Sequence, residues 1–152
     1  MEHRDHHHDS SWSTALSATL HCLTGCAIGE VLGMVLATWW GWSAVPSIAI
    51  AVVLAFFFGY LLTYSSARRG GLDVPGAIRL ALAADTVSIL VMELVDNGFV
   101  AAVPGALEAG LSDGLFWISL LGSLAVAFVV TVPVNRWMIG RGRGHAVAHR
   151  LH

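Results

Sequence analysis

The chain has 152 residues, of which 56% are hydrophobic and only 12% charged, and its mean hydropathy is +0.71. This composition excludes an ordinary soluble domain and indicates an integral membrane protein. The formal net charge of −2 says little, because the charged residues are sorted by position along the chain, and no nucleic-acid partner is expected.

Four apolar segments follow one another, at about residues 14–39, 45–64, 76–100 and 114–135. Each reaches the roughly 20 residues that cross a hydrocarbon core of about 30 Å, and each must be helical because lipid offers its backbone groups no hydrogen bonds. The third is the least apolar because it contains Asp85, Glu93 and Asp96. Ala, Leu, Ile and Val make up most of its other residues, so it is expected to span the membrane as well. The sequence thus predicts an all-α, four-helix transmembrane bundle over residues 14–137.

Arginines are unevenly placed between the loops. They flank the second connecting loop and follow the last span, whereas the first and third loops contain no Arg or Lys. The positive-inside rule therefore predicts that both termini are cytoplasmic and that the bundle lies in the cell inner (plasma) membrane. Asn135 and Arg136 are expected at the inner interface of that membrane.

Polar tails precede and follow the predicted bundle. Residues 1–13 are short, polar and rich in histidine, which is typical of disorder, and residues 138–152 are basic and also contain histidines. Imidazole is a common metal ligand, so both tails are candidate sites of cytoplasmic metal capture. The alternative is that they are only solvated chain ends. The candidate ligands are His6, His7, His8, His145, His149 and His152.

The stretch LHCLTGCAIGEVLGMV, residues 20–35, carries two kinds of row within the first span. Small residues four apart let helix backbones approach closely in membranes, which predicts a helix-packing stripe at Gly25, Gly29 and Gly33. Beside it run Cys22, Cys26 and Glu30, also four apart and expected to face the bundle interior. At this spacing along a straight helix the two cysteines are expected to be free thiols or ligands rather than a disulfide.

One face of the third span is polar. Because each helical residue turns by about 100°, this face collects Asp85, Ser88, Met92, Glu93 and Asp96. A charged side chain at the centre of a transmembrane helix costs about 2.5–3.5 kcal/mol on insertion scales, so an acid there is by default a functional candidate.

The first and third spans run in the same direction, and a rise of about 1.5 Å per residue sets their polar side chains at matching depths. Two candidate sites follow. A metal site for copper or zinc, whose ligand types suit a soft or borderline ion, consists of His21, Cys22, Cys26 and Asp85. An ion pathway consists of Glu30, Ser88, Met92, Glu93 and Asp96. The alternatives are that the cysteines only pack and that protonated acids hydrogen-bond between helices.

Three motifs, LHCLTGCAIGEVLGMV, VMELVDN and VPVNRWMIGRGRGHAVAH, resemble those of a bacterial membrane family known as domain of unknown function 4396, over roughly residues 15–149. The resemblance implies a small four-helix membrane protein and no particular activity. Some relatives occur alongside copper-oxidase-like proteins, which implies a link to metal handling.

The expected function is the binding or transport of a transition metal, copper or zinc, through the polar interior of the bundle. One alternative is a proton- or ion-coupled transporter or channel without metal, and another is a non-catalytic subunit that packs on a partner through the glycine stripe. No enzymatic activity is expected, although a thiol redox role remains a further alternative. Since four helices are few for a transport path, a homo-oligomer or a metal-handling partner is expected within the bilayer.

Overall fold

A computed structural model of the chain describes residues 5–140, with side chains from residue 12 onward. Over this range the chain is all-α and contains no strand. Its helices are α1 (Asp5–Trp40), α2 (Ala44–Arg69), α3 (Val74–Ala102) and α4 (Gly114–Gly140). The expected class, an all-α bundle of four helices, is confirmed.

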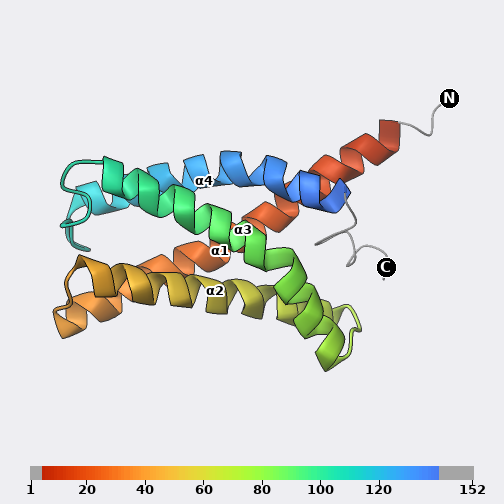
Figure 1. Cartoon of the computed structure of the whole chain (residues 1–152), viewed down its shortest axis with the longest axis horizontal. Coiled ribbons are helices and arrows are strands. Elements are labelled where there is room, and N and C mark those ends of the chain that lie inside the picture. Colours follow the sequence, from red (N-terminus) through yellow and green to blue (C-terminus); the bar gives the residue numbers. More distant parts are fainter. Residues whose placement is uncertain (1–4, 141–152) are drawn as a thin grey trace.

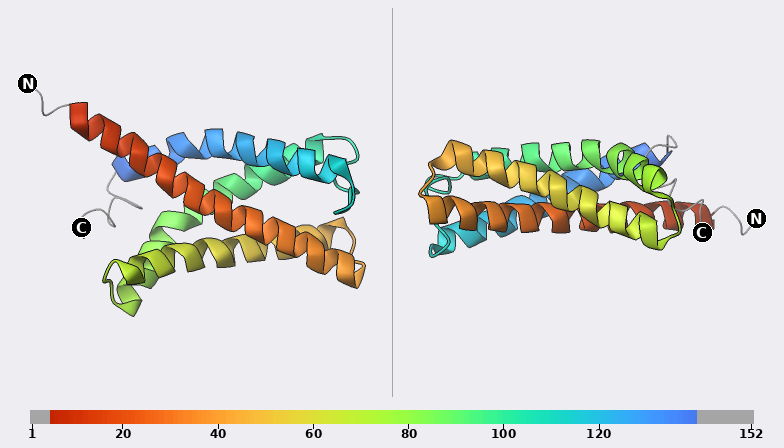
Figure 2. Two further views of the ribbon diagram at one scale, coloured as in Figure 1. Left: turned by 180° about the vertical axis from the view of Figure 1, so that it is seen from behind. Right: turned by 90° about the horizontal axis from the view of Figure 1, so that it is seen from below.

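Two of the helices cross as diagonals, and the other two lie along opposite sides of the bundle (Figure 1). α1 and α3 both start at the end that holds the N-terminus and run to the other end, so they are parallel. α1 packs against α2 toward its C-terminus and against α4 toward its N-terminus, and α3 contacts the same two helices from the other face (Figure 2). The polar faces of α1 and α3 therefore meet only where the two helices cross.

Helix ends differ from the limits of the apolar segments. α1 begins at Asp5, within the tail that composition indicates to be disordered, and α4 continues to Gly140. No Gly or Pro interrupts residues 5–13, and adding a residue to an existing helix is easier than starting one. At the far end of α4 the guanidinium of Arg136 lies over the Trp12 ring, 4.0 Å from its centroid, which ties the last turns of α4 to α1.

The turn between α2 and α3 follows from local chemistry. Gly71 has a φ of +97°, a conformation that costs glycine little because it has no Cβ. Asp73 then caps α3, accepting a hydrogen bond from the Gly76 N–H at 3.1 Å, and Pro75 stands in the first turn, where a missing N–H costs nothing. These residues reverse the chain so that α3 returns alongside α2.

Within the described part of the chain, three helices are long and apolar enough to cross a membrane: α1 over Trp12–Trp40, α2 and α4. The outer faces of the bundle are covered with apolar side chains, among them Val53, Leu94, Ile118, Leu121 and Val129. A water-soluble protein rarely exposes so continuous an apolar surface, so the chain is a membrane protein. That α3 also crosses the membrane stays a prediction.

The interior of the bundle combines small apolar side chains with an unusual number of polar ones. Alanines from every helix are buried there. Polar side chains from α1, α3 and α4 are buried with them: Thr19, Asp85, Ser88, Glu93, Asp96, Ser119, Ser123, Thr131 and Asn135. In a bilayer such an arrangement places the polar groups against one another and away from lipid.

Candidate functional site

The glycine stripe sets how closely α1 approaches α2. A Cβ built on Gly25 would lie 2.7 Å from the backbone nitrogen of Gly59, and one on Gly33 would lie 2.7 Å from the Cα of Ala51. Between them, Gly29 faces the backbone of Ala55. All three glycines thus contact α2 of the same chain, and the row of cysteines beside them turns toward α3.

Sulfur atoms and one carboxylate meet at the crossing of α1 and α3. The Cys22 thiol donates to Oδ1 of Asp85, with 3.6 Å between Sγ and the oxygen. One turn further, Sγ of Cys26 lies 3.9 Å from Sδ of Met92. Each of these four side chains is at most 1% exposed, and both cysteines are free thiols. The crossing therefore holds two thiols, a thioether and a carboxyl group in a space without solvent.

Apolar groups close this cluster on its other sides. Ala55 of α2, Ile89 of α3 and Ala127 of α4 pack against the cysteines and Met92. The matched depths expected for Cys22 with Asp85 are therefore observed, and Met92 lies opposite Cys26 rather than one level further along α1. We call Cys22, Cys26 and Met92 the sulfur cluster.

Carboxyl groups continue from the sulfur cluster toward the far end of the bundle. Glu93 lies near Cys26, and it accepts a hydrogen bond from the Asn97 amide at 3.2 Å. Glu30 of α1 and Asp96 of α3 lie near each other. One oxygen each of Glu30, Glu93 and Asp96 is buried and finds no hydrogen-bond partner among the described residues. Two carboxyl groups buried side by side cannot both be ionised unless a cation lies between them; without one, at least one group keeps its proton.

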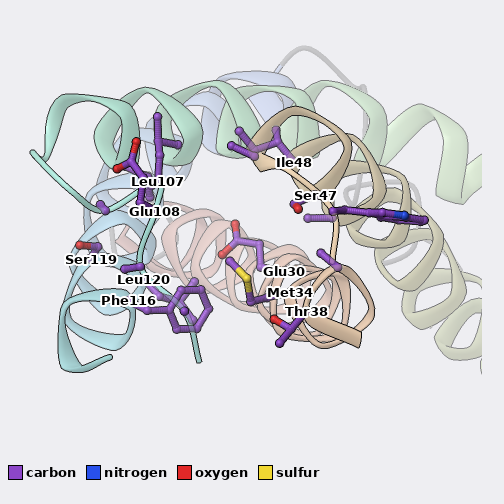
Figure 3. A pocket seen from close by; sticks show the side chains of 18 of the residues that line it. Glu30, Met34, Thr38, Ser47, Ile48, Leu107, Glu108, Phe116, Ser119 and Leu120 are labelled. Atoms are coloured by element: carbon purple, nitrogen blue, oxygen red, sulfur yellow. The ribbon is translucent and has the colours of Figure 1, made fainter. Parts of the chain in front are cut away.

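A cavity of about 400 Å³ opens next to Glu30 and Asp96. It lies where the C-termini of α1 and α3 meet the N-termini of α2 and α4, between the two loops at that end (Figure 3). Glu30 points into the cavity from α1, with Met34 and Thr38 beyond it on the same helix (Figure 3). The presence of this cavity depends on the angles between the helices, which no sequence pattern predicts.

A polar network on the other side of the sulfur cluster joins three helices. The Ser88 hydroxyl of α3 donates to Oδ1 of Asn135 on α4, and the Asn135 amide donates to the Thr19 hydroxyl of α1 at 2.8 Å. Thr19 in turn donates to the carbonyl of Ala15 at 2.7 Å. Asn135 is only 1% exposed, so this amide, close to the end of α4, is buried between the helices. The crossing of α1 brings Thr19 to Asn135 and explains why an amide next to Arg136 is buried.

The expected four-ligand metal site is not assembled. The side chain of His21 is exposed and lines a shallow surface depression with Ser17, Leu20, Thr24 and Leu62. One residue further along a helix is a turn of about 100°, so Cys22 faces the interior while His21 faces outward. Among the described residues no group of three or more His, Cys, Asp and Glu side chains is placed to hold a metal ion.

The other predicted residues divide into three groups. The acids and Ser88 of the expected ion pathway do lie inside the bundle, with Glu30 partly accessible through the cavity. The histidines expected to capture metal fall outside the residues whose side chains the structure describes: His6, His7, His8, His145, His149 and His152. The glycine stripe is covered by α2 and offers no free surface to another protein.

Comparison with known proteins adds a family but no closer relative. The model of a family described as "Domain of unknown function (DUF4396)" matches residues 11–144. No curated protein and no solved structure matches the chain.

Proposed function

This chain belongs to the DUF4396 family, and we propose that it is a membrane protein that binds a soft transition-metal ion, Cu(I), at its sulfur cluster. The proposal includes transport of this ion across the membrane. The observation that supports this is the contact of Cys26 with Met92, 3.9 Å between sulfurs, one helical turn from the buried Cys22. Thiolate and thioether groups are the ligands that select Cu(I).

The spacing of the sulfurs suits a shared ion. Metal–thiolate bonds are about 2.3 Å long, so two sulfurs on one ion lie up to about 4.6 Å apart. The separation of Cys26 and Met92 falls within this limit, and Cys22 projects from the same face of α1. Asp85, in contact with Cys22, supplies an acidic group beside the ion.

Zinc is a poorer candidate than copper in this cluster. Structural Zn(II) is almost always bound by four Cys, His or carboxylate ligands in a tetrahedron. His21, which would have been one of them, is turned outward. Cu(I) accepts few, soft ligands and needs no fourth side chain, so the outward position of His21 favours copper over zinc.

A competition titration tests the proposal. Protein purified in reduced form without a histidine affinity tag is titrated with Cu(I) against a Cu(I)-specific chelator, in parallel with the double variant Cys22→Ser, Cys26→Ser. We expect one ion per chain in the wild type and at least tenfold weaker binding in the double variant. The matched control is His21→Ala, which removes a neighbouring exposed ligand type and should bind as the wild type does. Equal binding by the double variant would rule out the sulfur cluster.

A second function is favoured by the carboxyl groups whose oxygens lack a partner, in Glu30, Glu93 and Asp96. In this case the acids carry protons or another cation through the bundle without metal. Liposomes containing the protein then show pH-dependent ion flux that Glu30→Gln abolishes and Cys22→Ser does not. The copper proposal predicts the opposite pattern for Cu(I) binding, which Cys22→Ser should weaken and Glu30→Gln should not. The two assays therefore distinguish the two functions.

The proposal includes a topology with α3 across the plasma membrane and both termini in the cytoplasm. In its support, Arg68, Arg69, Arg79 and Arg136 all lie toward the end of the bundle where α1 starts, whereas Glu108 and Asp113 lie in a loop at the other end (Figure 1). Single cysteines introduced at exposed Ser66 and Ser112 into a Cys22→Ala, Cys26→Ala background report this directly. A membrane-impermeant thiol reagent added to intact cells should label only the cysteine at position 112. Association into a homo-oligomer, or with a metal-handling partner, remains part of the proposal.

A further inference from the structure

The cavity beside Glu30 and Asp96 has the size of a site for an organic molecule rather than for an ion alone. Its volume is about 400 Å³, within the range of about 300–1,000 Å³ that small-molecule sites occupy. A bare metal ion bound by Glu30 and Asp96 would leave most of this space unfilled. The cavity is also separate from the sulfur cluster, which is closed on all sides by packed side chains.

Two acids enter the cavity from neighbouring helices, and the exposed Glu108 stands at its edge. Glu30 enters from α1 and Asp96 from α3, and both line the cavity. Asp96 is just 4% exposed, and its Oδ1 finds no donor among the described residues. A buried carboxyl oxygen without a partner is costly, and a cationic donor placed in the cavity would satisfy both acids at once.

The opposite walls are apolar and aromatic. They are formed by residues from α1, α2 and α4 and from the loop before α4, including Met34, Trp42, Ile48, Phe116 and Leu120. Some hydroxyl groups, such as that of Ser47, stand among them, but mostly apolar walls supply few of the six or more oxygen ligands that a hard metal ion takes. They do suit a hydrocarbon or aromatic body, and an aromatic ring face attracts an ammonium group.

We propose that this cavity binds a small organic ammonium ion, with its charged nitrogen between Glu30 and Asp96 and its apolar body against Phe116 and Leu120. Neither the sulfur cluster nor the copper proposal enters this inference. The site has one class of ligand, defined by a single positive charge joined to an apolar group of moderate size.

Binding of three matched probes to the protein in lipid nanodiscs tests this inference. The probes are 2-phenylethylammonium, the neutral 2-phenylethanol and the anionic 3-phenylpropanoate, each measured by calorimetry with subtraction of the signal of empty nanodiscs. The ammonium probe should bind at least tenfold more tightly than the alcohol, and the carboxylate should not bind. Equal binding of alcohol and ammonium would overturn the proposal, since the acids would then contribute nothing.

Four variants locate the site. Glu30→Gln and Asp96→Asn keep the shape and remove the charge, and each should weaken ammonium binding at least tenfold. Glu108→Gln changes an exposed acid at the edge of the same cavity and should change affinity by less than about threefold, as a simple surface charge would.

Should either buried variant fail to fold, Ile48→Trp fills the cavity from α2 and should abolish binding with all acids intact. Unchanged affinity in folded Glu30→Gln, or in folded Ile48→Trp, contradicts the proposal. The double variant Cys22→Ser, Cys26→Ser should bind the ammonium ion normally, so loss of the copper site and loss of this one are told apart.

Discussion

The thiol of Cys22 and the carboxyl group of Asp85 are in contact, 3.6 Å from Sγ to Oδ1, although 63 residues separate them in the sequence. They come from α1 and α3, the two helices that cross at the centre of the bundle (Figure 2). The contact is flanked on one side by Cys26 and Met92 and on the other by the network of Ser88, Asn135 and Thr19. A single helix crossing thus collects the sulfur, acidic and amide groups of the interior.

Close packing of α1 on α2 makes the glycine stripe sensitive to one methyl group. In Gly29→Ala the new Cβ would meet the backbone of Ala55, with its Cα at 2.6 Å. Backbone cannot move aside as a side chain can, so we expect the variant to lose about 1–3 kcal/mol of unfolding free energy. Gly98→Ala is the matched control, because a Cβ there meets nothing within 4 Å. Reversible unfolding in mixed micelles measures both, and equal stability would show that α1 and α2 are not packed in this way.

Loss of the Asn135 amide should loosen three helices together. Asn135→Leu removes the partner of both Ser88 and Thr19. Interhelical hydrogen bonds in membrane proteins contribute about 0.6 kcal/mol on average and up to about 1.7 kcal/mol, so we expect a loss of about 1–3 kcal/mol for two bonds. The same unfolding assay applies. Thr24→Val serves as the control, because the exposed Thr24 hydroxyl bonds only to the carbonyl of Leu20 in its own helix. A neutral Asn135→Leu variant would contradict the network.

Burial should make both cysteines slow to react. Cys22 and Cys26 are each 1% exposed, and alkylation requires an accessible thiolate. We expect a maleimide to modify the native protein at least tenfold more slowly than the protein in denaturing detergent. A cysteine placed at exposed Ser112, in the loop before α4, provides the fast reference. Equal rates at all three positions would mean that the thiols face outward.

The response of copper binding to pH follows from its ligands. Cu(I) binds to thiolates, so each coordinating thiol must release its proton on binding. Lowering the pH therefore opposes binding, and the apparent affinity should fall between pH 8 and about pH 6. Chelator competition at several pH values measures this fall, and the double variant Cys22→Ser, Cys26→Ser should show none of it. An affinity that rises on acidification would point to other ligands.

Residue spacing predicted the features that depend on a fixed helical geometry. A constant rise per residue was enough to bring Cys22 to the level of Asp85, and spacing by four put the glycines in one row. Spacing could not say which side of α1 the crossing would use, so His21 was grouped with Cys22 although it faces outward. It could not place Asn135 either, because its burial requires the start of α1 to lie against the end of α4. The cavity depends on the angles between whole helices, and these arise only when all four pack.

The most direct test of the copper proposal is X-ray absorption at the copper edge of the wild-type protein, loaded with one equivalent of Cu(I) and freed of excess metal. The account predicts a first coordination shell of sulfur atoms alone, with fewer sulfurs in Met92→Leu. A first shell dominated by nitrogen or oxygen, or no copper retained after removal of the excess, would contradict it.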